Sequence, residues 1–126
     1  MRSARVLVPF ALAATLVAAR DDPVGKELAG RVAGKPVTCI TASATSGPII
    51  LDDRTIMYRE GAGRRIWINR PRGQCAGLRE PATLIVQLFG SNVCRNDRFQ
   101  VLEWGSSIPS APCFFDDFTP YERVKN

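Results

Sequence analysis

From Pro36 onward, the chain consists of short runs in which hydrophobic and polar positions alternate with a period of two, separated by turn-forming residues. Such a period places successive side chains on opposite faces of a strand, whereas a helix needs a period of about 3.6 residues. The pattern predicts a mainly β protein, either a small antiparallel sheet or a partly open barrel, in a single β-rich domain over residues 37–126. The expected strands cover residues 37–41, 49–51, 55–59, 65–69, 83–89, 99–104 and 113–115.

Two of these runs form a predicted hairpin across the glycine-rich turn at residues 61–63. The alternating residues are Ile56 and Tyr58 in the first strand, and in the second Ile66 and Ile68 against Arg65, Trp67 and Asn69. Alternation of this kind is typical of a sheet with one face on the core and the other in solvent. Trp67 is then either a shield over the sheet, on its outer face or in a second packing layer, or a platform on which a ligand stacks.

Residues 20–36 are expected to form a short helix and a linker. Asp22 is a suitable N-cap, and Pro23 suits the first helical position. Val24, Leu28 and Val32 follow at intervals of four residues and form one apolar stripe, before Gly34 and Pro36 end the helix.

Residues 1–19 have the pattern of a signal peptide. Arg2 and Arg5 precede an apolar run, which ends at Val17-Ala18-Ala19, so we expect cleavage after Ala19. A membrane helix is the alternative, but spanning a bilayer takes about 20 apolar residues and this run is shorter. A lipid anchor would need a cysteine where Arg20 stands. The expected product is a periplasmic or secreted bacterial protein, with no stable membrane span after cleavage.

The cysteines Cys39, Cys75, Cys94 and Cys113 are even in number, which in an exported chain favours two disulfides. A zinc site is disfavoured because successive gaps of 36, 19 and 19 residues contain no close pair of ligands. Three connectivities are possible, and spacing does not choose among them. Our prediction is the nested arrangement, with Cys75–Cys94 inside Cys39–Cys113, in which each bond adds about 2–4 kcal/mol to stability.

Composition excludes several chemistries. The chain holds no histidine, which removes Ser-His-Asp triads, Cys-His nucleophile pairs and His-bound metals. Loss of the leader leaves 15 basic residues against 12 acidic ones, a net charge of +3, which gives little support to a nucleic-acid partner. No cofactor or metal is expected. Asp53 and Asp117 are the candidate acid and base for a carboxylate-based hydrolase, provided that the fold brings them into one cleft.

The main concentration of charge is the hairpin region, which holds six arginines between Asp52 and Arg72. One alternative is that they form a solvated rim, where exposed ion pairs are worth less than about 1 kcal/mol. The other is that their guanidinium groups bind an anionic partner. The candidate binding residues are Arg59, Arg65, Trp67, Asn69 and Arg70.

Across residues 28–124 the chain resembles an uncharacterised family of small exported proteobacterial proteins. The resemblance rests on the segments LAGRVAGKPVTCI, LDDRTIMYR, IWINRPRGQCAGL, GSNVCRNDRFQVLE and CFFDDFTPYERV. It implies export and one β-rich domain, and it carries no catalytic residue or ligand over to this chain.

Three functions are therefore open. The first is a non-enzymatic module of the cell envelope that binds an anionic polymer or a partner protein. The second is an inhibitor of a secreted hydrolase, such as a lysozyme or a protease, because a stapled β domain presents a rigid loop at little entropic cost. The third is the carboxylate-based hydrolase.

Overall fold

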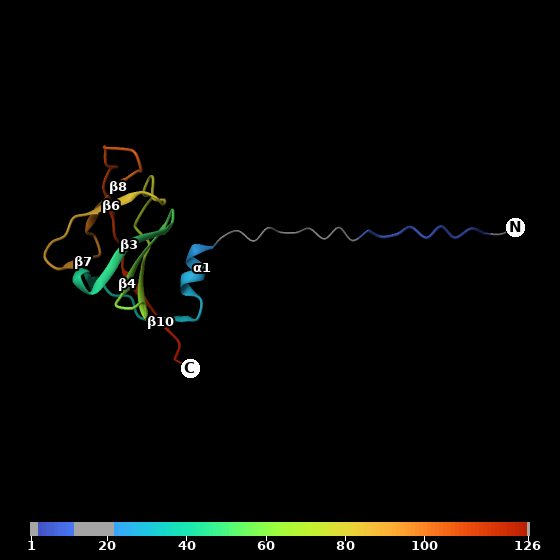
Figure 1. Cartoon of the computed structure of the whole chain (residues 1–126), viewed down its shortest axis with the longest axis horizontal. Helices are drawn as coiled ribbons and strands as arrows, with labels where there is room; N and C mark the ends of the chain where they lie inside the picture. The colour runs from blue at the N-terminus through green and yellow to red at the C-terminus, as the bar shows by residue number, and fades with distance from the viewer. Residues whose placement is uncertain (1–2, 12–21, 126) are drawn as a thin grey trace.

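The computed structural model describes residues 3–11 and 22–125, and the predicted cleavage site after Ala19 lies outside these ranges. Residues 3–11 are exposed and belong to no helix or strand (Figure 1). The elements of the globular part are α1 (Pro23–Leu28), β1 (Arg31–Ala33), β2 (Cys39–Thr41), a 3-10 turn (Ala42–Ala44), β3 (Thr45–Asp52), β4 (Thr55–Glu60), β5 (Arg65–Asn69), β6 (Thr83–Val86), β7 (Asn92–Cys94), β8 (Arg98–Leu102), β9 (Cys113–Phe114) and β10 (Phe118–Arg123).

The strands of residues 22–125 form three open sheets, in which every strand pair is antiparallel. The largest sheet has the order β1-β10-β5-β4-β3, the second pairs β2 with β7, and the third has the order β6-β8-β9. The predicted mainly β fold with one short N-terminal helix and disulfides is therefore confirmed.

The β4–β5 hairpin forms in the expected register, with Tyr58 opposite Trp67, but the expectation that one of its faces meets solvent is wrong. Residues 55–58 of β4 are all buried. One face packs Ile56 and Tyr58 into a core with Phe99 of β8, Phe115 and Phe118, and the other face carries a smaller cluster. This second cluster contains Met57, Ile66, Ile68, Leu28, Ile49, Leu51 and Tyr121. Leu28 of α1 is its member from outside the sheet, so the helix covers this second face of the hairpin.

The Tyr58 phenol is buried among Phe115 and Phe118, with ring centroids 6.4 and 6.0 Å away. Its hydroxyl has no hydrogen-bond partner among the described residues, and burial raises the pKa of Tyr58. Tyr58 is therefore a residue of the core, packed with these two rings.

The helix is shorter than predicted. Asp22 caps it as expected, because its Oδ1 accepts a hydrogen bond from Gly25 N at 2.9 Å. The helix ends at Leu28, however, and Gly30 adopts a φ of +71°, which reverses the chain into β1. Val32 consequently lies in an edge strand, where its side chain is 60% exposed, and it does not extend the apolar stripe of the helix.

The predicted nested disulfides are also wrong. The bonds are Cys39–Cys94 and Cys75–Cys113. Cys39 and Cys94 are direct partners in the antiparallel β2–β7 pair, with their Cα atoms 4.0 Å apart, so strand register decides this bond. Two intact disulfides are consistent with an oxidising extracellular compartment. Among the residues that the structure describes, no helix has the length and hydrophobicity needed to cross a bilayer.

Candidate anion-binding cleft

The five residues predicted to form one binding face do not come together. Arg59 projects from the face of β4 that carries Met57, and its Nη2 lies 3.5 Å from the carboxylate of Glu27 in α1. Arg65 and Trp67 project from the opposite face of the sheet, at the end of β5 that is distant from Arg70.

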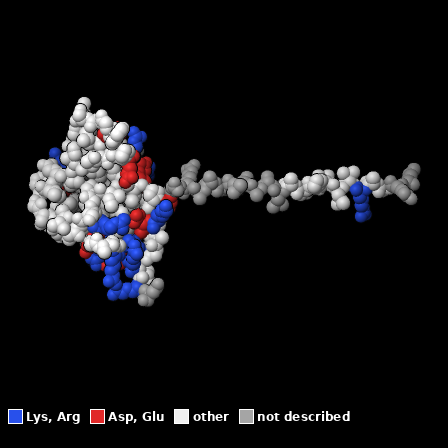
Figure 2. Space-filling view, viewed as in Figure 1, with Lys and Arg blue, Asp and Glu red and all other residues white. Residues whose placement is uncertain are grey.

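Arg65 and Trp67 belong to a cluster whose charges are already paired. Trp67 Nε1 donates a hydrogen bond to Glu60 Oε2 at 2.8 Å, and Arg65 is paired with Glu122. The bond to Glu122 raises the pKa of Arg65, and the guanidinium also lies over the Trp67 ring, 5.6 Å from its centroid. Figure 2 shows basic and acidic side chains on the same face of the molecule. An anionic ligand would have to compete with these internal acids for Arg65.

Asn69 is fully buried, and its side chain bridges two segments of the chain. Its Nδ2 donates to the carbonyls of Asp116 at 2.7 Å and Asp117 at 3.3 Å, and its Oδ1 accepts from Asp116 N at 3.1 Å. The side chain thus joins the end of β5 to the segment that enters β10. It fixes the direction in which the chain leaves β5, and so the position of the exposed Arg70.

A cleft of about 830 Å³ opens at the end of the hairpin where Arg70 lies. It is lined by Asp53, Arg54, Arg70, Pro71 and residues 73–79. Three of these described residues are arginines, Arg54, Arg70 and Arg79, and one is a carboxylate. The cleft therefore combines one predicted binding residue with two arginines that the prediction did not include.

Local structure holds two of these arginines at the same end of the hairpin. In the β3–β4 turn, Asp52 Oδ1 accepts a hydrogen bond from Arg54 N at 2.9 Å, which shapes the turn around Arg54. Ile56 lies opposite Asn69 in the β4–β5 register, so continuing that register by two residues places Arg54 across from Pro71. The sequence contained this signal, because the hairpin turn sets the register and hence the pairing of residues beyond the strand ends.

The loop of residues 73–79 forms the rest of the cleft lining, and it is held in place at several points. Cys75 is bonded to Cys113 of β9, and Leu78 is buried with an exposure of 2%. Gly77 has a φ of +77°, and a Cβ there would lie 2.8 Å from the carboxylate of Glu103. Glycine at this position lets the loop approach Glu103 closely, and Arg79 then extends from an anchored backbone.

The cleft arginines differ in their partners: Arg79 has a weak acidic partner, whereas Arg54 and Arg70 have none among the described residues. Arg79 Nη2 lies 3.2 Å from Glu103 Oε1, but the two side chains are 77% and 51% exposed, so solvent weakens this pair. Within residues 22–125, neither Arg54 nor Arg70 lies within 4.0 Å of a carboxylate oxygen. An anion entering the cleft would thus meet two unpaired guanidinium groups.

No protein-family model matches this chain, and neither a curated protein nor a solved structure matches it. The resemblance to small exported proteobacterial proteins therefore stays a prediction.

The two carboxylates of the candidate hydrolase, Asp53 and Asp117, have different surroundings. Asp53 lines the cleft, but Asp117 is not among the lining residues. Asp117 Oδ2 lies 3.3 Å from Arg95 Nη1, and Asp116 Oδ1 lies 3.7 Å from Arg95 Nε. The two carboxylates proposed as acid and base do not share this cleft.

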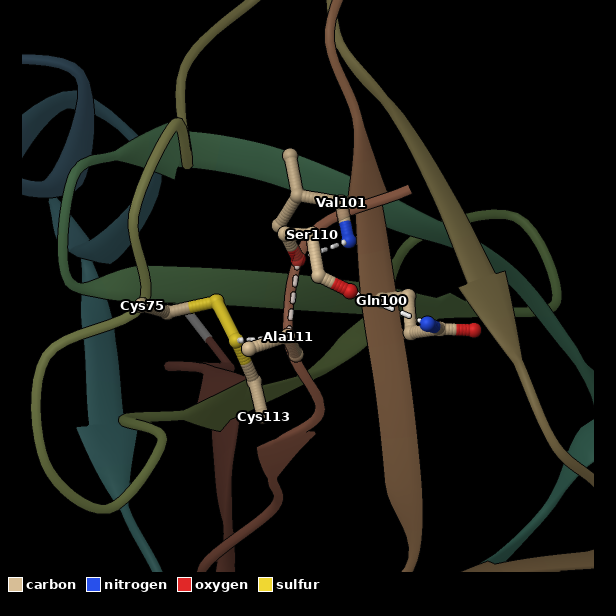
Figure 3. The surroundings of a disulfide bond; sticks show 6 residues. All are labelled: Cys75, Gln100, Val101, Ser110, Ala111 and Cys113. Carbon is tan, nitrogen blue, oxygen red and sulfur yellow. Dashed lines mark hydrogen bonds between the residues drawn. A yellow bond between two sulfur atoms is a disulfide. The ribbon is translucent and has the colours of Figure 1, made fainter. Parts of the chain in front are cut away.

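The loop of residues 103–112, which we call the braced loop, meets the cleft lining at Glu103, whose Oε1 lies 3.2 Å from Arg79 Nη2. Figure 3 shows its C-terminal end, at Ser110 and Ala111. At its base, Ser110 Oγ accepts from Val101 N at 2.9 Å, Ser110 N donates to the Val101 carbonyl at 2.8 Å, and Gln100 Nε2 donates to the Ser110 carbonyl at 2.9 Å. The Cys75–Cys113 bond closes the other side, next to Ala111. These contacts attach the C-terminal end of the loop, at Ser110, to β8.

The braced loop presents Trp104 with 82% of its surface exposed. The backbone turns at this point, since Ser106 N donates to the Glu103 carbonyl at 3.0 Å and Gly105 has a φ of +81°. Trp104 lines a hollow of about 250 Å³ together with Arg79, Pro81, Ala82 and Glu103. Arg79 lines both this hollow and the cleft, so the two are neighbours across its side chain.

Proposed function

We propose that the protein is a non-enzymatic binding module of the bacterial cell envelope, periplasmic or secreted, which captures anionic groups in the cleft. The observation that carries this proposal is the pair Arg54 and Arg70, which lines the cleft without a carboxylate partner among the described residues. The disulfides support function outside the cytosol.

The chemistry of the cleft suits carboxylate or phosphate groups. A guanidinium group offers a planar fork of donors that matches two oxygens of either anion. Gln74 and the backbone of loop 73–79 add uncharged hydrogen-bonding groups along the same wall. Because the protein as a whole is only mildly basic, attraction is local to the cleft and falls with added salt.

Reversing the two free charges tests this proposal. The double variant Arg54→Glu/Arg70→Glu is titrated with polygalacturonate and with inorganic polyphosphate at low ionic strength. We expect its affinity for both to fall at least about tenfold, since each lost charge-assisted hydrogen bond is worth about 1.5–3 kcal/mol.

The matched control is Arg64→Glu/Arg123→Glu, which makes the same change in net charge at the other end of the hairpin. Both control residues are exposed, and we expect binding by this variant to stay within about twofold of the original. Equal loss in the two variants, no loss in either, or no binding by the original protein would refute the cleft as the anion site.

A second candidate function, inhibition of a secreted hydrolase, is favoured by the braced loop. The loop carries Ile108 with 79% of its surface exposed, next to Pro109, and a preorganised loop loses little entropy on docking. The purified protein is added to lysozyme and trypsin assays, where stoichiometric loss of activity is expected for this function. Ile108→Asp should restore activity and Phe89→Asp, on another exposed loop, should not; full activity at molar excess would reject inhibition of these enzymes.

A further inference from the structure

The cleft and the hollow beside Trp104 share Arg79 in their linings. We propose that the ligand is an acidic polysaccharide, a chain of sugar units bearing carboxylates, and that one sugar ring stacks on Trp104. This inference rests on the proposed function and adds the chemical class of the ligand. In this arrangement the carboxylates meet Arg54 and Arg70, while the polymer runs along Arg79 toward the indole.

The first support is the position of Trp104. A sugar ring has one face of C–H groups, and this face packs well against the flat, electron-rich face of an indole. Trp104 is highly exposed, and it lies in a backbone turn where Ser106 N donates to the Glu103 carbonyl, so its ring is open to a ligand. It also lies next to a cation, since it shares a hollow with Arg79. A charged sugar presents both matching features, an apolar ring face and a carboxylate.

The second support is the extent of the site. Pockets of about 300–1,000 Å³ hold ligands of many heavy atoms, and the cleft alone has about 830 Å³. A single phosphate or acetate ion would fill a small part of it. A polymer uses the whole cleft and the hollow of about 250 Å³ that follows.

The test compares Trp104→Ala with Phe89→Ala, which removes an exposed aromatic ring from another loop. Both variants are titrated with polygalacturonate, inorganic polyphosphate, dextran and polyglutamate, and the heat of binding is followed by calorimetry. For Trp104→Ala we expect affinity for polygalacturonate to fall about five- to tenfold, by analogy with stacking of other ring systems on aromatic side chains. Affinity for polyphosphate should stay unchanged, dextran should not bind, and Phe89→Ala should behave like the original protein.

The outcomes separate the two proposals. If Trp104→Ala binds polygalacturonate as well as the original protein, the polysaccharide inference is wrong, while the anion site stands as long as Arg54→Glu/Arg70→Glu still abolishes binding. If polyglutamate binds as tightly as polygalacturonate and depends equally on Trp104, the ligand class is wrong and an acidic protein replaces it. If the arginine variant has no effect on any polymer, both proposals fail together.

Discussion

Replacing Cys75 and Cys113 with alanine is expected to lower the free energy of unfolding by about 2–4 kcal/mol. The bond joins residues separated by 38 positions and therefore restricts the unfolded chain substantially. In the folded state it fastens a segment without strands, residues 70–82, to β9 in the core. Denaturant unfolding without reductant measures the loss.

This variant should also weaken polygalacturonate binding, because Cys75 lies in the wall of the cleft. The matched control is Cys39→Ala/Cys94→Ala, which removes the bond between β2 and β7, where the sequence separation is 55. We expect a similar loss of stability in the control but unchanged binding below its unfolding transition. A Cys75→Ala/Cys113→Ala variant as stable as the original protein would contradict the observed pairing.

Replacing Asn69 with alanine is expected to cost about 2–4 kcal/mol of stability. The change removes three hydrogen bonds and leaves backbone groups of the half-buried residues 116–117 without these partners, each at a cost of about 1–3 kcal/mol that relaxation and water partly offset. Asn69→Asp should lose at least as much, because a carboxylate keeps the bond from Asp116 N but is buried as a charge facing the carbonyl oxygens of Asp116 and Asp117. Chemical denaturation of the purified variants measures these differences.

The matched control is Asn92→Ala at the first position of β7, where the side chain is exposed and makes no hydrogen bond among the described residues. Its effect should stay below about 0.5 kcal/mol. If Asn69→Ala proved as mild as Asn92→Ala, the bridge between β5 and the entry to β10 would not have the structural role described above.

The sequence predicted those parts of the fold in which the information is local. Alternation of Ile56 and Tyr58, with a glycine turn after them, sufficed for the β4–β5 hairpin. The cap formed by Asp22 likewise depends on neighbours within one helical turn. In both cases the interacting residues are close in the chain, so a single window of sequence contains the cause and the effect.

Long-range pairing is what the sequence pattern missed. Residues 118–123 form β10 in the middle of the largest sheet, although Pro120 makes that segment unlike an interior strand. Pro120 is tolerated opposite Trp67, while its carbonyl accepts a hydrogen bond from Gly34 N at 2.8 Å. The short β7 was missed for a similar reason, because only its pairing with β2 defines it, and the Cys39–Cys94 bond follows from that same pairing.

The prediction of the candidate site likewise missed contacts between residues that are distant in the chain. Grouping Arg59, Arg65 and Asn69 by closeness in sequence mixed opposite faces of the sheet and included a buried residue. Arg54 and Arg70 are 16 positions apart, yet the hairpin brings them to one end. Trp104 reaches the same region only through the fold of β6, β8 and the braced loop, which no local pattern indicated.

The most direct measurement of the central claim is the map of backbone amide shifts in an NMR titration with polygalacturonate. We predict the largest shifts at Arg54, Arg70, Gln74 and Arg79, which line the cleft. The face around Arg65 and Glu122 should change little, since its charges are already paired. Shifts centred on Arg65 and Glu122, with the cleft amides unmoved, would contradict the account.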